Sequence, residues 1–193
     1  MIRRRKEVYM SWRTRGHRGD ALENTIELSN DYYRLHGYAR VDKVSVPITV
    51  VKRNDQGQIV KAYFERRSTV DFLGIAQGIF FCFDCKETQG LSLPLANIHD
   101  HQLSYMEDIR KQGGVSFFIV HFKKFDEYYL VPYEIAVHYK KKMEAGGRKS
   151  IPYSAMKKAI RIGLFMDGLL NYLPSINVYL DYLENDHDYN LDE

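Results

Sequence analysis

Cysteine is scarce in this chain: Cys82 and Cys85 are the only two among 193 residues. Two are too few for a zinc site of four cysteines. They form a C-x-x-C pattern, which in thioredoxin-like proteins stands where a loop enters a helix. Here residues 79–86 predict a strand, and side chains three apart on a strand point to opposite faces. We therefore expect unpaired thiols, which disfavours a redox protein.

Long apolar runs are also missing. No stretch approaches the roughly 18 residues of a membrane-spanning helix. The basic N-terminus has no apolar segment behind it, unlike a secretory signal. With 45% hydrophobic and 27% charged residues, the composition is that of a globular protein long enough to bury a core. We expect a cytoplasmic protein with no membrane partner.

The net charge is only +3, but the charges are unevenly placed. Residues 1–18 carry seven Arg or Lys against one Glu, whereas residues 181–193 carry six acids and no Lys or Arg. Basic arms commonly contact phosphate, although such an arm can also be only a solvated chain end. The sequence predicts a basic arm over residues 1–19, a folded domain over 20–185 and an acidic tail over 186–193.

Periodicity and turn signals predict the main elements. Residues 20–35 predict a helix, with Asp20 as its cap, Glu23 completing a capping box, and His36-Gly37 as its stop. Residues 46–52 and 58–64 predict a hairpin around the turn at 54–57. The other predicted elements are an extended segment around Asp71, strands at 79–86, 115–122 and 128–131, and helices at 98–111, from 132 to before 146, and from 174 or 175 to 184. This order suggests an α/β fold with a mixed central β-sheet flanked by helices.

Asp84 and Lys86 carry the chemistry that stands out. They lie two residues apart on a predicted strand and so share a face. Asp71, across the Gln77-Gly78 turn, can join them from a neighbouring strand. Paired carboxylates hold Mg²⁺ beside a phosphate, and a lysine steadies the growing charge. The D-x-K pattern alone also fits a surface ion pair; its place at the end of an apolar strand favours an active site.

Several short motifs then match one family in order along the chain. They are RG at 18–19, LE at 22–23, NDYY at 30–33, STVDF at 68–72, FDCKET at 83–88, PLANIHDHQ at 94–102 and GRKSI at 147–151. Together with the last helix they resemble the RecU-type Holliday junction resolvases, whose fold is that of restriction endonucleases. Three positions depart from the pattern: Val70 replaces a proline, Cys82 stands where relatives can carry an acid, and Asp84 replaces a longer glutamate.

The resemblance implies a Mg²⁺-dependent endonuclease, with Mn²⁺ as a substitute. It would resolve four-way DNA junctions by paired symmetric nicks in recombination and repair. The implied catalytic residues are Asp71, Asp84, Lys86 (stabilising the transition state) and Glu23. The implied metal ligands are Thr69, Asp71, Asp84 and Gln102. Glu23 fits a capping box equally well, and Thr69 and Gln102 also fit ordinary strand and helix positions.

The resemblance further implies a homodimer, because two symmetric cuts need two sites related by a twofold axis, and contact with other recombination proteins. The hairpin, over about residues 46–67, resembles a protruding stalk that enters the junction centre. The implied DNA-binding residues are Arg18, Lys52, Arg53, Lys61, Arg66 and Arg67. A hairpin with merely solvated charges is the alternative.

Two other functions stay open. A restriction-like nuclease acting on linear duplex would share the acidic pair, and a non-catalytic DNA-bridging recombination partner would share the fold. His99 and His101 suggest a two-histidine metal site, but side chains two apart on a helix do not face one another. Asp100 is expected to support the start of that helix.

Overall fold

The computed structural model describes residues 20–45, 48–64, 69–165 and 167–184. The predicted DNA contacts Arg18, Arg66 and Arg67, the basic arm and the acidic tail lie outside the described residues, as does the side chain of Asp20. Within the described part of the chain, no helix is both long and apolar enough to cross a membrane.

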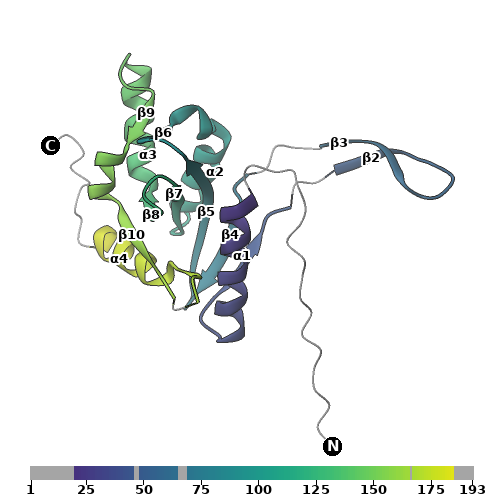
Figure 1. Ribbon diagram of the computed structural model, residues 1–193, viewed down its shortest axis with the longest axis horizontal. Coiled ribbons are helices and arrows are strands. Elements are labelled where there is room, and N and C mark those ends of the chain that lie inside the picture. Colours follow the sequence, from purple (N-terminus) through teal and green to yellow (C-terminus); the bar gives the residue numbers. More distant parts are fainter. Residues whose placement is uncertain (1–19, 46–47, 65–68, 166, 185–193) are drawn as a thin grey trace, which may run out of the picture.

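A seven-stranded mixed sheet forms the centre of the molecule (Figure 1). In spatial order its strands are β1 (Arg40–Lys43), β4 (Phe72–Ala76), β5 (Ile79–Thr88), β7 (Val115–Phe122), β8 (Glu127–Pro132), β10 (Ile160–Leu164) and β11 (Leu170–Asn171). The β5–β7 pair is parallel and the other neighbours are antiparallel. A parallel pair needs a long crossover, and here the crossover contains a helix. The expected mixed sheet flanked by helices is confirmed.

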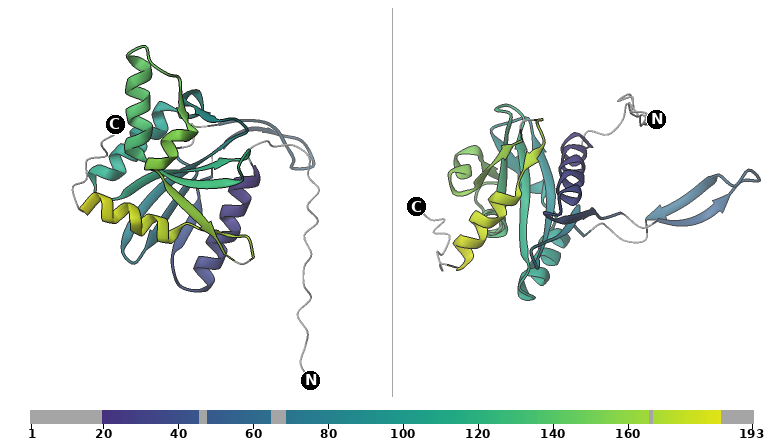
Figure 2. Two further views of the ribbon diagram at one scale, coloured as in Figure 1. Left: turned by 60° about the vertical axis from the view of Figure 1, so that its left-hand side comes forward. Right: turned by 90° about the horizontal axis from the view of Figure 1, so that it is seen from below.

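Helices cover both faces of this sheet (Figure 2). They are α1 (Asp20–Leu35), α2 (Asp100–Lys111), α3 (Tyr133–Glu144) and α4 (Leu173–Glu184), with short 3₁₀ segments η1 (Leu95–Asn97) and η2 (Tyr153–Lys158). A small antiparallel pair, β6 (Ser92–Pro94) with β9 (Ser150–Pro152), joins η1 to the segment after α3. One buried cluster packs α1 and α4 on the sheet, and a second packs α2 and α3 on its other face.

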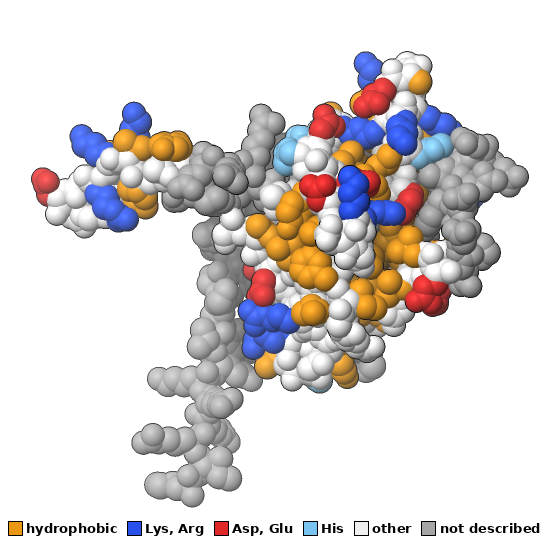
Figure 3. Space-filling model, turned by 180° about the vertical axis from the view of Figure 1, so that it is seen from behind, with side chains coloured by type: hydrophobic (Ala, Val, Ile, Leu, Met, Phe, Trp, Pro, Cys, Tyr) orange, Lys and Arg blue, Asp and Glu red, His pale blue; other side chains and the backbone are white. Residues whose placement is uncertain are grey.

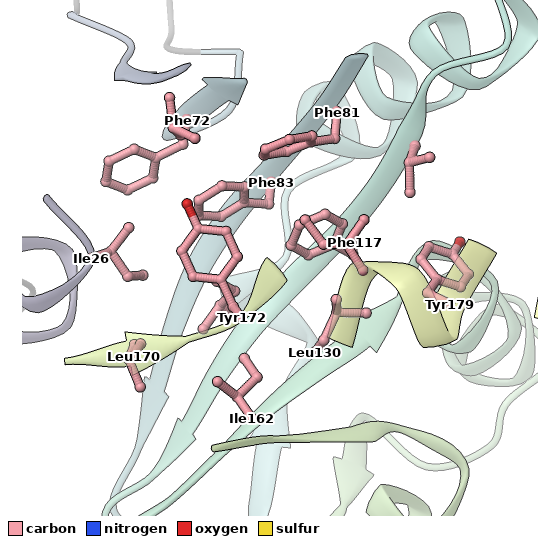
Figure 4. Close-up of a cluster of buried hydrophobic side chains, with 14 of the residues drawn as sticks. Ile26, Phe72, Phe81, Phe83, Phe117, Leu130, Ile162, Leu170, Tyr172 and Tyr179 are labelled. Atoms are coloured by element: carbon pink, nitrogen blue, oxygen red, sulfur yellow. The ribbon is translucent and has the colours of Figure 1, made fainter. Parts of the chain in front are cut away.

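Aromatic rings dominate the first of these clusters (Figure 4). Phe83 stacks between Phe72 and Phe117, with ring centroids 5.0 and 5.1 Å away. All three rings are fully buried. Successive residues of a strand point to opposite faces, so Phe83 on one face leaves Asp84 on the other. The strand that carries the candidate chemistry is therefore anchored by its own aromatic neighbours.

The β2 (Ile48–Arg53) and β3 (Ile59–Phe64) strands pair only with each other and project away from the body (Figure 1). The expected protruding hairpin is confirmed. Its described residues combine exposed apolar side chains, such as Val60 and Tyr63, with lysine and arginine. Figure 3 shows these basic groups along the hairpin. A two-stranded hairpin is marginal by itself in water, so this one is suited to a function outside the core.

The thiols also lie as expected: Cys82 packs in the α2–α3 cluster, Cys85 packs against the α1–α4 cluster, and both are free. The sequence expectations were incomplete in two respects. β1, β10, β11 and the β6–β9 pair were not predicted, since each has only two to five residues. The helix expected from residue 98 begins at Asp100, after the separate 3₁₀ turn η1.

Candidate active site

Asp84 and Lys86 share the α2–α3 face of β5. The Lys86 ammonium forms an ion pair with Asp84 Oδ1, and the side chains are 13% and 0% exposed. A fully buried carboxylate is costly unless it is paired. Burial, and then the negative charge of Asp71, raise the pKa of Asp84 to about 7, while Lys86 opposes this shift. The predicted pair is therefore an ion pair within the protein and not one on its surface.

Asp71 stands immediately before β4, which pairs with β5. Its Oδ2 accepts a hydrogen bond from the backbone N–H of Cys85 at 2.7 Å. That bond ties the first carboxylate to the strand that carries the second. The charge of Asp71 acts on Asp84 strongly enough to raise its pKa. The sequence expectation that adjacent strands bring the two carboxylates together is borne out in the geometry.

Gln102 reaches the same site from the first turn of α2. Its Nε2 donates a hydrogen bond to Asp84 Oδ2, and its Oε1 accepts the backbone N–H of His99 at 3.1 Å. Gln102 is buried. The family resemblance implied that Gln102 is a metal ligand, and an amide side chain binds a hard cation through its oxygen. In the structure that oxygen is engaged by the backbone, and the amide NH₂ group faces the carboxylate.

Glu23 and Thr69 are the two remaining residues that were predicted for this site. Glu23 forms an ion pair with Lys43 of β1 at 3.0 Å. After burial, the charges of Asp71, Asp84 and Glu23 raise the pKa of the Cys85 thiol well above its ordinary value. Glu23 is therefore close enough for its charge to be felt beside the two aspartates. Thr69 precedes the buried Val70 and is partly exposed.

Lys43 is a residue that sequence analysis did not single out. It contacts both Glu23 and Glu27 of α1, and burial of its ammonium is outweighed by these two carboxylates, so its pKa is raised. No sequence motif marked Lys43, and the four-residue strand that contains it was not predicted. Lys43 holds the start of α1 against the sheet on the side of Asp71.

The histidines at the start of α2 correct one expectation. The rings of His99 and His101 stack, with centroids 5.4 Å apart. His99 has extended backbone angles, φ −88° and ψ 145°, so the helical spacing rule does not apply to it. Asp100, between them, pairs with Lys140 of α3 at 2.9 Å.

The residues present fit a divalent cation. Asp84 Oδ1 is buried and accepts no hydrogen bond from the described residues, although Lys86 lies against it. Carboxylate oxygens are the ligands that Mg²⁺ prefers, and one or two suffice when water and phosphate complete the shell. Across the described ranges, no cluster of three or more His, Cys, Asp or Glu side chains is placed to hold a metal. The carboxylate pair thus suits Mg²⁺ better than a metal that requires an all-protein cage.

The carboxylate pair lies away from the pocket at the start of β5. This pocket, of about 260 Å³, is lined by Ile79 and Phe81 together with residues of α1 and α4. The carboxylates are absent from its lining.

The predicted hairpin cations Lys52, Arg53 and Lys61 are all exposed. Lys52 and Lys61 are cross-strand partners, an arrangement of like charges that is unfavourable without an anion nearby. Arg53 donates through Nη1 to the backbone oxygen of Gly57 at 3.0 Å. The structure therefore places these three cations together on the hairpin, apart from the carboxylates.

Comparison with known proteins gives this arrangement a family. The family model of Recombination protein U (RecU) matches residues 17–178. This chain belongs to the RecU family. The match includes α1, the carboxylate pair with Lys86, α2 and the start of α4.

Individual RecU relatives are similar over most of their length. The Holliday junction resolvase RecU of Oenococcus oeni is 36% identical over 167 residues, which cover 83% of this chain and 85% of that protein. The one from Staphylococcus carnosus is 38% identical over 168 residues, 84% of this chain and 81% of that protein. Among solved structures, Archaeoglobus fulgidus Hjc, a Holliday junction resolvase, matches with a TM-score of 0.44 and 9% identity. That match covers 70% of this chain and 94% of the other.

Proposed function

We propose that this protein is a Holliday junction resolvase, a divalent-metal-dependent endonuclease that cuts four-way DNA junctions by paired symmetric nicks. The observation that carries the proposal is the convergence of Asp71, Asp84 and Lys86 at one end of the sheet in a chain of the RecU family. The RecU relatives that it matches are named as Holliday junction resolvases. The basic hairpin supplies the phosphate contacts that such a substrate needs.

Each residue of the site has its own role in this proposal. Asp71 and Asp84 would hold Mg²⁺, or Mn²⁺ in its place, which when bound polarises a phosphoryl oxygen and promotes ionisation of water. Lys86 neutralises Asp84 in the metal-free protein, and its ammonium is positioned to stabilise negative charge that develops on a phosphate. Gln102 and the Cys85 backbone amide fix the orientation of the two carboxylates.

Binding to the junction rests on shape and phosphate contacts in this proposal. The hairpin projects from the body (Figure 1), and its exposed Lys52, Arg53 and Lys61 would contact the DNA. A homodimer would supply the two equivalent sites that symmetric nicking needs. Contacts with other recombination proteins would bring the dimer to junctions in recombination and repair.

Cleavage of a labelled synthetic four-way junction, compared with a matched linear duplex, tests this function. The reactions contain Mg²⁺, Mn²⁺ or EDTA, with Asp71→Asn, Asp84→Ala and Lys86→Ala as variants. We expect symmetric nicks in the junction alone, lost with EDTA and with each variant, while gel-shift binding of the junction persists. Cutting of linear duplex would instead indicate a restriction-like nuclease. Tight binding without cutting would indicate a DNA-bridging protein, and robust cutting by Asp84→Ala would exclude this active site.

A further inference from the structure

The chain between Lys140 and Lys158 is strongly basic, and the proposed active site does not use it. It carries seven Lys or Arg against one acid, Glu144. It comprises the end of α3, the β9 strand and η2. The end of α3 projects beyond the sheet (Figure 1), and basic side chains gather on that part of the surface (Figure 3).

Buried side chains and hydrogen bonds hold this basic segment against the rest of the protein. Ile151 is fully buried and Met156 is 4% exposed. The hydroxyls of Tyr153 and Tyr129 both donate to Glu127 Oε2, which links η2 to the central sheet. The β9 strand pairs along its length with β6. The cations of the basic segment therefore lie on an ordered surface. Little conformational entropy is lost when they bind an anion.

Four of these cations have no acidic partner within the part of the chain that the structure describes. Lys141, Arg148, Lys149 and Lys157 are exposed, and no ion pair joins any of them to an acid of the described residues. Arg148 Nε donates only to Ser150 Oγ, at 3.0 Å. Arg40, by contrast, is an exposed cation that is paired with Asp42. Unneutralised neighbouring cations repel one another, and a polyanion relieves that repulsion.

The segment lies at the same end of the sheet as the carboxylates. The backbone N–H of Leu95 donates to the Lys149 oxygen at 3.1 Å, and η1, which Leu95 begins, leads into the helix that carries Gln102. Asp100 of that helix pairs with Lys140. In Figure 1 the end of α3 projects upward at the upper left of the body, whereas the hairpin projects to the right.

We propose that Arg148, Lys149 and Lys157 bind the phosphate backbone of one duplex arm of the junction, on the side of the active site opposite the hairpin. The hairpin then contacts the crossover, and this basic surface holds an arm that leads away from it. The inference rests on the proposed function, because it assigns a further DNA contact to the same enzyme. A duplex is the fitting partner, since its phosphates form a regular line of negative charge.

The test is the salt dependence of junction binding by Arg148→Gln/Lys149→Gln/Lys157→Gln. Fluorescence anisotropy with a labelled four-way junction in EDTA, over about 50 to 200 mM salt, measures Kd without cleavage. Each lost phosphate contact reduces the slope of log affinity against log salt by about 0.9. We expect a slope smaller by about 2 to 3 and a Kd at least about tenfold weaker at the lower salt. The same arm contact predicts weaker binding of linear duplex.

A matched control removes the same charge elsewhere. Arg34→Gln/Arg40→Gln/Lys111→Gln deletes three exposed cations at the other end of the sheet and should leave the slope unchanged. Equal losses in both triple variants, or no loss in the first, overturn the inference. If the first triple variant fails to fold by circular dichroism, the single changes Arg148→Gln and Lys149→Gln should each lower the slope by about 1; unchanged slopes overturn the inference.

Two further readouts separate this inference from the proposed function. Hydroxyl-radical footprinting should show that the triple variant loses protection along one arm and keeps it at the crossover. Loss at the crossover instead would overturn the placement. If the unmodified protein neither binds nor cuts a four-way junction, the proposed function fails. If it does both and the triple variant behaves identically, only the arm contact fails.

Discussion

Gln102 couples Asp84 to the first turn of α2 with both ends of its amide. Its Nε2 donates to Asp84 Oδ2 while its Oε1 accepts the His99 backbone N–H at 3.1 Å. If the amide were reversed, its NH₂ group would face the His99 N–H, donor to donor, and its oxygen would face Asp84 Oδ2, acceptor to acceptor. The two partners therefore fix the orientation of the amide. Gln102 is in this way a positioning residue that holds one oxygen of Asp84 and leaves Oδ1 for Lys86 or a metal.

Gln102→Ala should therefore weaken metal binding only partly. It removes a buried donor to a carboxylate, which we expect to cost about 1–3 kcal/mol of stability, and it leaves both aspartates in place. Titration with Mn²⁺, followed by electron paramagnetic resonance, should show a much smaller loss of affinity than Asp84→Ala causes. Gln112→Ala, at the exposed end of the same helix, is the control. Loss of Mn²⁺ binding as complete as that in Asp84→Ala would show that Gln102 is itself a ligand.

Asp84 should make the metal-free protein less stable as pH rises. Burial and the charge of Asp71 raise its pKa in the folded protein to about 7, against 3.8 for the free side chain. The folded state therefore holds this proton more tightly than the unfolded chain does. The stability contributed by protonated Asp84 is fully present below about pH 4 and is lost as pH rises through about 7.

Asp84→Asn measures this contribution. Urea unfolding in EDTA should show that the variant is more stable than the unmodified protein at pH 8, with a difference that shrinks toward pH 5 because neutral Asp84 resembles asparagine. Asp108→Asn, at an exposed aspartate of the described chain, is the matched control. A pH-independent difference between Asp84→Asn and the unmodified protein would contradict the raised pKa. Added Mg²⁺ should stabilise the unmodified protein alone at pH 8.

Much of the site could be predicted because strand geometry is simple. Alternation on a strand put Asp84 and Lys86 on one face, and the Gln77-Gly78 turn allowed Asp71 to lie beside them. Both turn residues have positive φ, 50° and 86°, which suits a tight hairpin connection. The apolar run of residues 115–122 correctly indicated a strand buried on both faces.

The features that the sequence did not predict depend on tertiary contacts, which no local sequence pattern encodes. Lys43 matters because α1 brings Glu23 and Glu27 to it. The direction of the Gln102 amide depends on the extended backbone of His99. β9 is only three residues long and is a strand because it pairs with β6. The ordered structure that follows Arg148 and Lys149 could therefore not be recognised from the sequence.

Tyr33 links α1 to the chain that leads into α4, and its hydroxyl should matter for stability. It accepts the backbone N–H of Tyr172 at 2.8 Å and donates to the Leu170 oxygen at 3.1 Å. Tyr33→Phe would leave a buried N–H without its partner, at a cost of about 1–3 kcal/mol in the free energy of unfolding. Tyr38→Phe, on an exposed ring, should cost far less. Equal urea midpoints for the two variants would contradict this role.

The hairpin cations give the last prediction, because Lys52 and Lys61 oppose each other across the two strands. Like charges so placed destabilise a hairpin, and the phosphates at a junction centre would relieve that repulsion. Lys52→Gln/Lys61→Gln should weaken four-way junction binding with a salt slope smaller by about 2, and should leave the melting temperature unchanged or slightly raised. Lys52→Arg/Lys61→Arg keeps the charge and should retain the affinity. Because the hairpin is expected at the crossover, linear duplex binding should fall much less than junction binding. Equal losses on both substrates would mean that the hairpin binds DNA without regard to branching, and the selectivity for junctions would then have to arise elsewhere.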